Sequence, residues 1–447
     1  MFALRMPLER SLEAMLAALP MRGRFCLDGA PDHPEGRWAF LGAEPEEVLE
    51  VRFGAPVLAP LERLDADPDL SLEGDPIDLP PDAIPRWVGF LSYDAAWSEP
   101  AAFGLRRAPR LTRDPRWPVV WMGRYVKLVA VDLARGEAWA LGPDRAASEA
   151  LARLLSEPPP RPSPASGGAS PQVWVEPSPI HRARVEHALE AIAAGDLYQV
   201  NLARAWRVPW TGSAVPLFGA MRAASPVPLG AYVELDAGAV VCRTMERFLR
   251  WDRRARRLWT SPIKGTIART GDDDAGEAER LTRDDKERAE HSMIVDLMRN
   301  DLSRVAEVGS VRVASALRVE PFAGLSHLVS TVHARTREGV TIRDVIAATF
   351  PPGSVTGTPK LAAMELIERE EAEARGVYTG AVGYVDRAGG LSLAVAIRAA
   401  RVDEHATYFA GGGLVSASDP DREIAETELK AEVFLAAIRE LSTKNSD

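Results

Sequence analysis

The chain has 447 residues, with 54 Lys and Arg against 64 Asp and Glu, so its formal net charge at pH 7 is -10. This acidic balance argues against general nucleic-acid binding, and no stretch approaches the roughly 18 consecutive apolar residues that a membrane span needs. The length predicts two or three domains of roughly 150 residues each, or one large α/β unit.

The start of the chain and its cysteines indicate a protein that is not exported. Residues 1–20 mix charged residues into apolar ones and have no continuous apolar core of the kind found in signal peptides. The two cysteines, Cys26 and Cys242, stand far apart, which excludes a disulfide framework and a thiolate metal site. We therefore expect a cytoplasmic location.

Residues 156–171 (SEPPPRPSPASGGASP) form the low-complexity segment of the chain. Such a composition cannot bury enough apolar surface to become ordered by itself. The segment is predicted to be a linker or a long exposed loop. It separates an N-terminal region, 1–155, from a second region, 172–447.

Lysine is scarce in this chain: only six of the 54 basic residues are lysines, and 48 are arginines. Arg stays protonated, whereas a desolvated Lys can lose its proton and act as a nucleophile. For each lysine in this Arg-rich chain we therefore ask whether the position requires an amine rather than only a positive charge. Lys264 lies in the sequence SPIKGT (261–266), a strand end that turns at Gly265. It directly follows an Arg-rich run, 250–257, that is predicted to form a solvated hairpin turn. Lys264 is therefore a candidate amine nucleophile.

Two helices are predicted in the second region. The first begins near Asp284, and its buried face is predicted to contain Ile294, Leu297 and Met298. The second follows Ser418-Asp419-Pro420, a capping residue with Pro in the first turn, and runs to Leu441. Its predicted apolar face consists of Leu429, Val433, Ala437 and Leu441.

Between these helices lies a Gly- and Thr-rich loop, 352–360 (PGSVTGTPK), that leads into another helix. The free N–H groups at a helix start favour an anion, and the loop lacks the Gly-Lys-Ser/Thr ending of a nucleotide P-loop. A carboxylate is the expected guest, with ordinary helix capping as the alternative.

Three strands are predicted at 380–386, 391–399 and 407–415. The third contains Gly411, Gly412 and Gly413, a run that suits close approach of a ligand to the backbone, although a β-bulge is equally compatible. Arg398 ends the second strand, where it could hold a carboxylate in a bidentate fork. His327 and Tyr378 are polar residues in apolar surroundings.

Glutamates occur at three-residue spacing on both predicted helices: Glu287 and Glu290 on the first, Glu423 and Glu426 on the second. Four carboxylates without nearby thiolates suit a hard cation such as Mg²⁺. The alternative is two solvated helix faces, which the i, i+4 pair of Glu426 and Lys430 supports.

Taken together, these segments resemble the chorismate-utilising enzymes, and among them the aminodeoxychorismate synthase group. The resemblance is strong over 172–447 and thinner over the N-terminal half, where it rests on residues 33–37 and 87–94. The motifs that carry it are YQVNL (198–202), ERF (246–248), PIKGT (262–266), EHSMIVDLMRNDLSRV (290–305), HLVS (327–330), 353–360, 378–384 and 423–430.

The resemblance implies an α+β fold in which both halves form one α/β sandwich, with two packed β-sheets flanked by helices and a central cleft. It implies that Lys264 attacks C2 of chorismate, that Glu246 protonates the departing C4 hydroxyl, and that His327 supports this step. Residues implied in substrate binding are Thr358, Tyr378, Arg398, Gly411, Gly412, Gly413 and Lys430. Residues implied in Mg²⁺ binding are Glu290 and Glu426, supported by Glu287 and Glu423.

Two positions distinguish the reactions of this family. Gln199 stands where the enzymes that add water to chorismate carry a Lys, and Lys264 stands where anthranilate synthases carry Ala. Neither cysteine lies in a nucleophile-elbow motif, so the resemblance implies a separate glutaminase subunit that supplies ammonia. An anthranilate synthase and a non-catalytic anion-binding protein are the alternatives.

Overall fold

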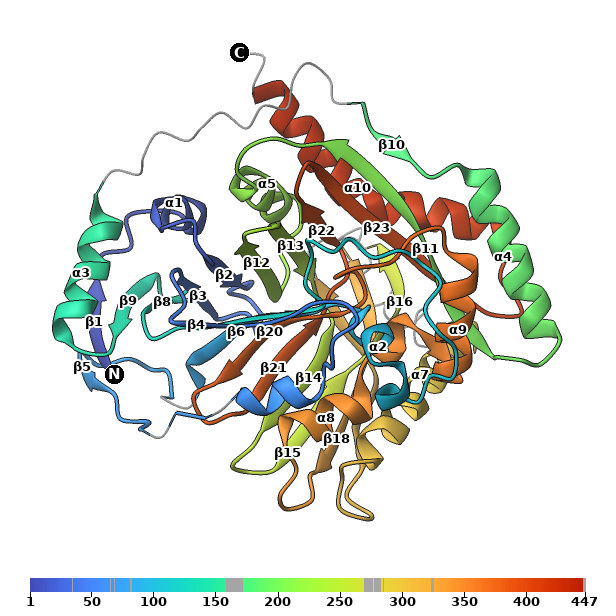
Figure 1. Cartoon of the computed structure of the whole chain (residues 1–447), viewed down its shortest axis with the longest axis horizontal. Coiled ribbons are helices and arrows are strands. Elements are labelled where there is room, and N and C mark those ends of the chain that lie inside the picture. The colour runs from blue at the N-terminus through green and yellow to red at the C-terminus, as the bar shows by residue number, and fades with distance from the viewer. Residues whose placement is uncertain are drawn as a thin grey trace.

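The computed structural model describes residues 1–447 except 34, 65, 68, 81–82, 158–171, 269–275, 277–282, 284, 323–324 and 445–447. It does not describe the side chains of 266–268, 285–287, 321–322, 325 and 444 either. Of the Pro-rich segment 156–171, only Ser156 and Glu157 lie within the described residues, so its predicted role as a loop is not tested. The described strands form two sheets with helices on their outer faces (Figure 1).

The larger sheet has 13 strands among the described residues, and every pairing in it is antiparallel except that of β1 with β5. In spatial order its strands are β10 (Trp174–Val175), β11 (Gln199–Pro209), β23 (His405–Leu414), β22 (Ala399–Val402), β13 (Gly238–Thr244), β12 (Leu229–Leu235), β2 (Phe25–Asp28), β3 (Trp38–Gly42), β8 (Leu128–Asp132), β9 (Glu137–Gly142), β1 (Phe2–Met6) and β5 (Glu73–Gly74). The short strand β19 (Gly357–Thr358) also pairs with β11.

The second sheet has 10 strands among the described residues, all antiparallel to their neighbours. In spatial order they are β16 (Ile263–Ala268), β18 (Leu325–Arg335), β15 (Arg257–Ser261), β14 (Arg247–Asp252), β21 (Leu391–Val395), β20 (Ala381–Asp386), β6 (Pro85–Leu91), β7 (Val120–Arg124) and β4 (Glu47–Val51), with β17 (Arg312–Phe322) paired to β18. The hairpin of β14 and β15 turns at the predicted Arg-rich run.

Both sheets contain strands from both halves of the chain. β2 pairs with β12 in the larger sheet, and β6 pairs with β20 in the second. Side chains from the two sheets meet in a common apolar layer, where Phe25 and Phe40 of the larger sheet join Val88 and Phe90 of the second. The predicted α+β sandwich of two packed sheets is confirmed.

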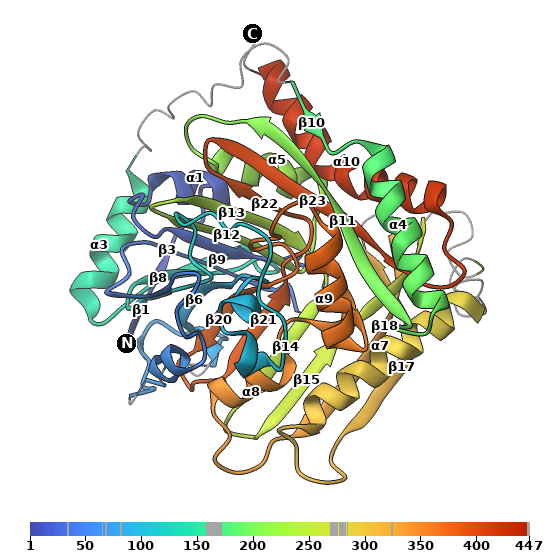
Figure 2. The same cartoon turned by 45° about the vertical axis from the view of Figure 1, so that its right-hand side comes forward.

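Helices cover the outer faces. α1 (Leu12–Ala18), α3 (Arg145–Ser156), α5 (Val215–Ala224) and α10 (Pro420–Lys444) share an apolar cluster with the larger sheet. α4 (Ser178–Ala193), α7 (Asp285–Ser303), α8 (Ile342–Thr349) and α9 (Lys360–Glu370) share another, mainly with the second sheet. Figure 2 shows α9 lying beside β11. The remaining short helices are α2 (Ala95–Ser98), η1 (Ala59–Arg63), η3 (Pro100–Phe103) and η4 (Gly353–Val355).

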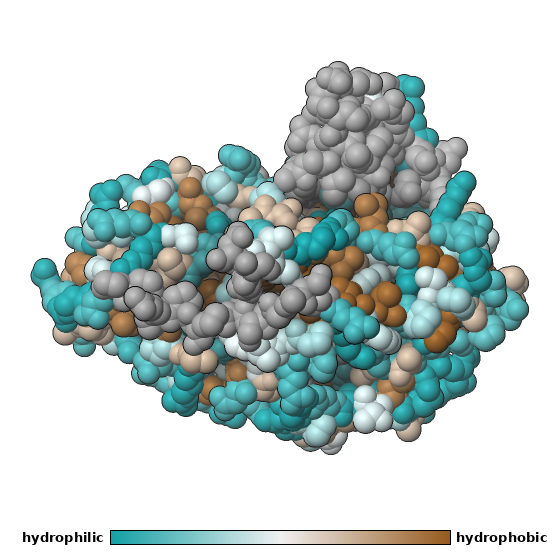
Figure 3. All heavy atoms as spheres, turned by 90° about the horizontal axis from the view of Figure 1, so that it is seen from above, coloured by the Kyte–Doolittle hydropathy of each residue, from teal (hydrophilic) through white to brown (hydrophobic). Residues whose placement is uncertain are grey.

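The side chains of β2 show how the sequence pattern sets the layers. Phe25 and Leu27 point into the layer between the sheets, while Cys26 points to the helix-covered face. This is the period of two that a pleated strand imposes. The outer surface seen from above is mostly hydrophilic, with scattered hydrophobic residues (Figure 3). None of the described helices is long and apolar enough to span a membrane.

The two predicted long helices are present as α7 and α10. In α7, Ile294, Leu297 and Met298 are buried as expected. In α10, Asp419 caps the start, since its Oδ1 accepts the N–H of Asp421 and of Arg422 at 3.1 Å each.

The predicted apolar face of α10 is wrong at Leu429, which is 75% exposed. The buried face instead contains Glu423, Thr427, Ala431, Phe434, Ala437 and Ile438. Each of these positions lies three or four residues from another one in the set, so they lie on one side of the helix. The polar members are buried because the start of this face lies beside the candidate site rather than the apolar core.

The predicted strand 391–399 is divided into two. β21 ends at Val395 in the second sheet, and β22 begins at Ala399 in the larger sheet. Between them Arg398 has a φ of 50°, in the left-handed region that a non-glycine residue rarely adopts. The chain therefore crosses from one sheet to the other at residues 396–398.

A buried ion pair secures the edge of β11. The Arg375 guanidinium lies 2.6 Å from Glu371 Oε1, and both residues are only 3% exposed. Glu371 accepts the N–H of Ala203, and Arg375 donates to the carbonyls of Asn201 and Val355. Side chains thus occupy the place of a neighbouring strand along the middle of β11, which satisfies its buried backbone groups.

We predict that Arg375→Leu lowers the free energy of unfolding by about 3–5 kcal/mol, because it leaves the Glu371 carboxylate buried without its counter-charge. The measurement is urea denaturation followed by tryptophan fluorescence. The matched control is Arg153→Leu, which removes a pair of the same i, i+4 spacing with Glu149 whose side chains are 69% and 41% exposed. Its loss should cost less than about 1 kcal/mol, and equal effects of the two changes would contradict the prediction.

Candidate functional site

Gly413 of β23 lies beside Lys264 and Gln199, the two residues that the resemblance uses to distinguish the reactions of the family. A Cβ at Gly413 would lie 2.7 Å from both Lys264 Nζ and Gln199 Nε2, so a larger residue here would require these two side chains to move. Gln199 is fully buried, and neither its Nε2 nor its Oε1 has a hydrogen-bond partner among the described residues. A buried amide without partners is costly, so this position suits a polar ligand.

Glu246 lies immediately before β14 and is 5% exposed. Its N–H donates to Thr244 Oγ1 at 3.1 Å, and its carbonyl accepts the N–H of Val395 at 3.0 Å, which fixes its backbone. Burial raises the pKa of its carboxyl to about 7, against the opposing effects of a hydrogen bond from Ser354 and the charge of Lys264. A carboxyl with this pKa is suited to proton transfer near neutral pH.

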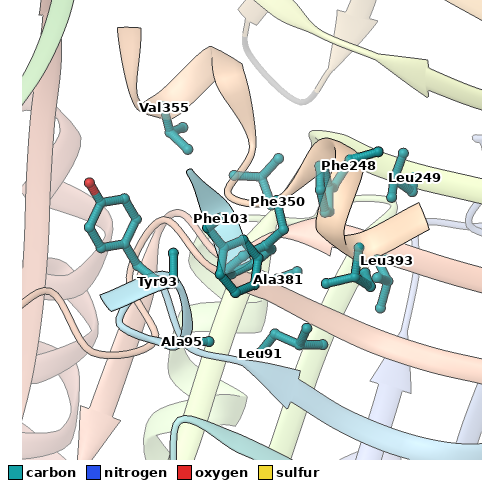
Figure 4. Close-up of a cluster of buried hydrophobic side chains, with 14 of the residues drawn as sticks. Leu91, Tyr93, Ala95, Phe103, Phe248, Leu249, Phe350, Val355, Ala381 and Leu393 are labelled. Carbon is teal, nitrogen blue, oxygen red and sulfur yellow. The ribbon is translucent and has the colours of Figure 1, made fainter. Parts of the chain in front are cut away.

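Three aromatic rings pack together next to the loop that carries Ser354. Phe350 packs edge-on against Phe103 and against Phe248, with ring centroids 6.2 Å apart in each case. Figure 4 shows these rings together with Val355, the residue that follows Ser354. Lys360, which follows the same loop, does not enter the site. Its Nζ binds Asp301 Oδ2 at 2.5 Å and the carbonyls of Thr349 and Pro351.

His327 of β18 is 4% exposed, and its Nδ1 lies 3.2 Å from the carbonyl oxygen of Gly265. Burial lowers the pKa of His327 to about 4, and the charges of Arg398 and Lys430 act in the same direction. The imidazole is therefore neutral at pH 7. The contact with Gly265 favours the tautomer in which Nδ1 carries the proton and Nε2 is an acceptor.

Arg398 is held at the crossing between the sheets. Its guanidinium makes no hydrogen bond or ion pair with any residue that the structure describes. Burial lowers the pKa of the guanidinium from its usual value, although Arg remains charged at neutral pH. A half-buried cation that has no counter-ion among the described residues is suited to binding an anion.

Gly412 faces the opposite side of β23 from Gly413. A Cβ there would lie 2.7 Å from Glu423 Oε2 and 3.7 Å from Glu426 Oε1. Lys430 Nζ lies 2.6 Å from Glu426 Oε1 and donates to the carbonyl of Gly411 at 2.8 Å. The glycine run therefore contacts the carboxylates of α10 on one side and Lys264 on the other.

Two of the four predicted metal ligands, Glu423 and Glu426, lie beside Gly412. Glu290 is buried on α7, and the side chain of Glu287 lies outside the described side chains. No group of three or more His, Cys, Asp or Glu among the described residues is close enough to hold a metal ion. The Glu423 and Glu426 pair fits a hard cation held by two carboxylates, waters and substrate, so magnesium binding stays a prediction.

Thr358 and Tyr378 border the same strands. Thr358 of β19 pairs with Gln199 of β11. The ring of Tyr378 stacks on Phe409 of β23, with centroids 5.4 Å apart and an interplanar angle of 18°. The Arg375 guanidinium lies 5.7 Å from the centroid of the Tyr378 ring.

Sequence reasoning did not list Ser354 or Arg375 as site residues. Ser354 lies within the predicted anion-binding loop, so the motif contained it without indicating its contact with Glu246. Arg375 had no signal, since a Glu and an Arg four residues apart are common on solvated helices. His291 is a third addition, with Nε2 2.6 Å from Ser330 Oγ.

Comparison with known proteins shows the family and the fold of the chain. The family model described as chorismate binding enzyme matches residues 25–436. The crystal structure of anthranilate synthase component I from Streptococcus pneumoniae superimposes with a TM-score of 0.75 and 26% sequence identity, covering 90% of this chain and 93% of that chain.

Two curated relatives carry different names at similar identity. Anthranilate synthase component 1 of Aquifex aeolicus is 41% identical over 257 residues, which cover 57% of this chain and 52% of that protein. Aminodeoxychorismate synthase component 1 of Klebsiella aerogenes is 42% identical over 237 residues, which cover 52% of each protein. The chain thus spans about half the length of these relatives. On the match to residues 25–436, the chain belongs to the chorismate-binding enzyme family.

Proposed function

We propose that the chain converts chorismate and ammonia to 4-amino-4-deoxychorismate, a step toward para-aminobenzoate and folate, as an aminodeoxychorismate synthase component I. The observation that carries the proposal is the position of Lys264, whose Nζ lies beside Gly413 and Gln199. Its charge also acts on Glu246, a buried acid with a pKa of about 7. An amine that could act as a nucleophile thus lies within electrostatic range of a buried acid that could donate a proton.

In the first step of this mechanism, the amine of Lys264 attacks C2 of the chorismate ring. The two ring double bonds shift by one position each, and the C–O bond at C4 breaks. Glu246 gives its proton to the departing hydroxyl, which leaves as water, and becomes a carboxylate. Burial favours the protonated form that this step requires.

In the second step ammonia attacks C4, the double bonds shift back, and the C2–N bond to Lys264 breaks. The Glu246 carboxylate accepts the proton that the new C4 ammonium group loses. Both residues return to their starting forms, and the net change is replacement of the C4 hydroxyl by an amino group with release of water. In this proposal neutral His327 accepts a hydrogen bond at the hydroxyl-leaving side.

The remaining residues hold the dianionic substrate. Arg398 and Lys430 offer positive charge, while Thr358 and Tyr378 offer hydroxyl groups near β11 and β23. Mg²⁺ held by Glu423 and Glu426 with Glu290 would neutralise the ring carboxylate and offset the acidic side chains around it.

A second candidate is anthranilate synthase component I. The similar identity of the Aquifex aeolicus relative and the likeness to the Streptococcus pneumoniae structure support it. In that reaction ammonia enters beside the ring carboxylate and pyruvate is released, so the products distinguish the candidates.

We further propose that a separate glutaminase supplies the ammonia. Glutamine hydrolysis in this context requires a reactive thiolate, and both cysteines of the chain are fully buried. Burial raises the pKa of the Cys242 thiol to about 12 and that of Cys26 well above its usual value. Neither is a nucleophile at neutral pH.

We predict that the purified chain, given chorismate, Mg²⁺ and ammonium, forms 4-amino-4-deoxychorismate, identified by mass spectrometry and NMR. Lys264→Ala should lower kcat/KM to below about one thousandth of the wild-type value, since no other amine replaces the nucleophile. Lys127→Ala, which changes an exposed lysine elsewhere, is the control.

Anthranilate and pyruvate as products would favour the second candidate instead. Binding of chorismate without any turnover would favour a non-catalytic anion-binding protein. Full activity of the Lys264→Ala variant would remove the proposed role of the lysine.

We predict that activity falls as pH rises through about 7, because the acid form of Glu246 is lost above its pKa. In a pH profile of kcat, Glu246→Gln should remove this alkaline limb and lower the rate by about 10²–10⁴-fold, as expected for loss of a general acid. Glu9→Gln, at an exposed position, should leave the profile unchanged. An alkaline limb that persists in Glu246→Gln would assign it to another group.

A further inference from the structure

Three consecutive residues of the N-terminal half, 92–94, bind one glycine of the second half. Gly376 donates its N–H to Asp94 Oδ2 at 2.8 Å. The carbonyl oxygen of Gly376 accepts the Ser92 hydroxyl at 2.6 Å and the N–H of Tyr93 at 2.9 Å. All three residues of the segment are buried. Both backbone polar groups of Gly376 are therefore satisfied by a segment that lies far away in the sequence.

Gly376 belongs to the loop 371–380 between α9 and β20, which also carries Tyr378. The N–H of Tyr378 donates to the carbonyl of Arg375 at 3.1 Å, which closes a tight turn around Gly376. Gly376 has a φ of 58° and Thr379 has a φ of 60°, so residues in the left-handed region flank Tyr378. The direction in which the Tyr378 side chain leaves the loop depends on this backbone conformation.

The other end of the loop is bonded to the segment where the chain crosses between the sheets. Thr379 donates its N–H to the carbonyl of Ala396 at 2.8 Å, and Ala396 donates its N–H to the carbonyl of Gly380 at 2.9 Å. Ala396 lies two residues before Arg398 in the crossing segment. Hydrogen bonds therefore connect residues 92–94, through this loop, to the crossing that carries Arg398.

Tyr378 and Arg398 are two of the residues that hold chorismate in the proposed function. The ring of Tyr378 stacks on Phe409 of β23, and the charge of Glu426 acts on its phenol group. The charge of Arg398 acts on the imidazole of His327. Both side chains thus lie within electrostatic range of other groups of the candidate site.

We propose that Ser92 and Asp94 of the N-terminal half are positioning residues for chorismate binding, which act by holding Gly376 and thereby the side chain of Tyr378. This inference rests on the proposed function, in which Tyr378 binds the substrate. Neither Ser92 nor Asp94 touches a reacting atom. When the loop leaves the bonded conformation, the apparent affinity for chorismate falls in proportion to the fraction of molecules that keep it. Saturating chorismate selects that conformation, so kcat is largely retained.

The first test changes the backbone preference of Gly376. A Cβ at this position would have no heavy atom within 4 Å beyond its chain neighbours, so a side chain here meets open space. Val is strongly disfavoured in the left-handed region, whereas Asn tolerates it. Gly376→Val should raise the KM for chorismate by about tenfold and change kcat by less than about twofold. Gly376→Asn is the matched control and should keep the KM within about twofold of the wild-type value.

The second test removes the acceptor of the Gly376 N–H. Asp94→Ala should raise the KM for chorismate by at least about tenfold, and Ser92→Ala should raise it less, because Tyr93 still donates to the Gly376 carbonyl. Asp94 also pairs with Arg113, whose Nη2 lies 3.1 Å from Asp94 Oδ1. Arg113→Leu removes this ion pair and keeps the bond to Gly376. It should lower the free energy of unfolding without raising the KM by more than about twofold.

The dissociation constant of chorismate, measured by calorimetric titration without ammonium, should change as the KM does in every variant. Unchanged affinity in both Gly376→Val and Asp94→Ala overturns the positioning role. An equal loss of affinity in Gly376→Asn or Arg113→Leu also overturns it, since that indicates general distortion. Absence of aminated product from the wild-type chain overturns the proposed function instead, and the calorimetric comparison still decides the positioning role.

Discussion

The ion pair between Glu371 and Arg375 holds together the parts of the molecule on which the candidate site depends. Arg375 donates to the backbone of β11 at Asn201 and to the Val355 carbonyl in the loop that carries Ser354. It also donates to Thr379 and lies against the ring of Tyr378. One buried guanidinium therefore fixes the distance between a strand, a loop and an aromatic ring. A buried pair of this kind gives little net stability by itself, but removing one partner leaves a charge in an apolar setting. The role of the Glu371 and Arg375 pair is therefore to fix the relative positions of β11, the loop and the ring.

The passage of the chain from one sheet to the other is the second constraint. It brings Arg398 to the junction of the sheets, with β21 ending on one side and β22 beginning on the other. The left-handed conformation of Arg398 is unfavourable for a residue with a side chain, so the surrounding structure must compensate for it. Such strain is expected where a side chain has to be held in one orientation. Here that side chain is the Arg398 guanidinium, which has no hydrogen-bond or ion-pair partner in the described part of the chain.

The sequence allowed the class of fold and much of the site to be predicted, but for different reasons. Helix α7 was predicted from its periodic apolar residues, because a helix that packs on a core repeats its burial every three or four positions. The same reasoning failed at Leu429, since the buried side of α10 begins with Glu423 and Thr427, and polar residues give no hydrophobic signal. The break at residues 396–398 was missed because an apolar run looks alike whether it stays in one sheet or crosses to another.

The site residues came from motif resemblance rather than from periodicity. Lys264, Gln199 and Gly413 are far apart in sequence, and no local pattern places them together. Ser354 and Arg375 act through contacts with distant segments, so a single sequence offers no local signal for them. Hydrophobic periodicity in the sequence predicts which positions are buried. Contacts between buried polar residues that are far apart in the sequence are seen only in the folded structure.

Successive glycines of β23 face opposite sides of the strand, so the register in which β23 pairs with β11 determines which functional groups each glycine faces. Leu202 lies opposite Gly412, and Asn201 lies opposite Gly413. Gly412 faces the carboxylates of α10, and its neighbour Gly413 faces the amine of Lys264 on the other side of the strand. A slip of one residue would turn each glycine to the other side and exchange the two surroundings. Strand pairing, usually regarded as a matter of folding, here also determines which functional group each side of the strand meets.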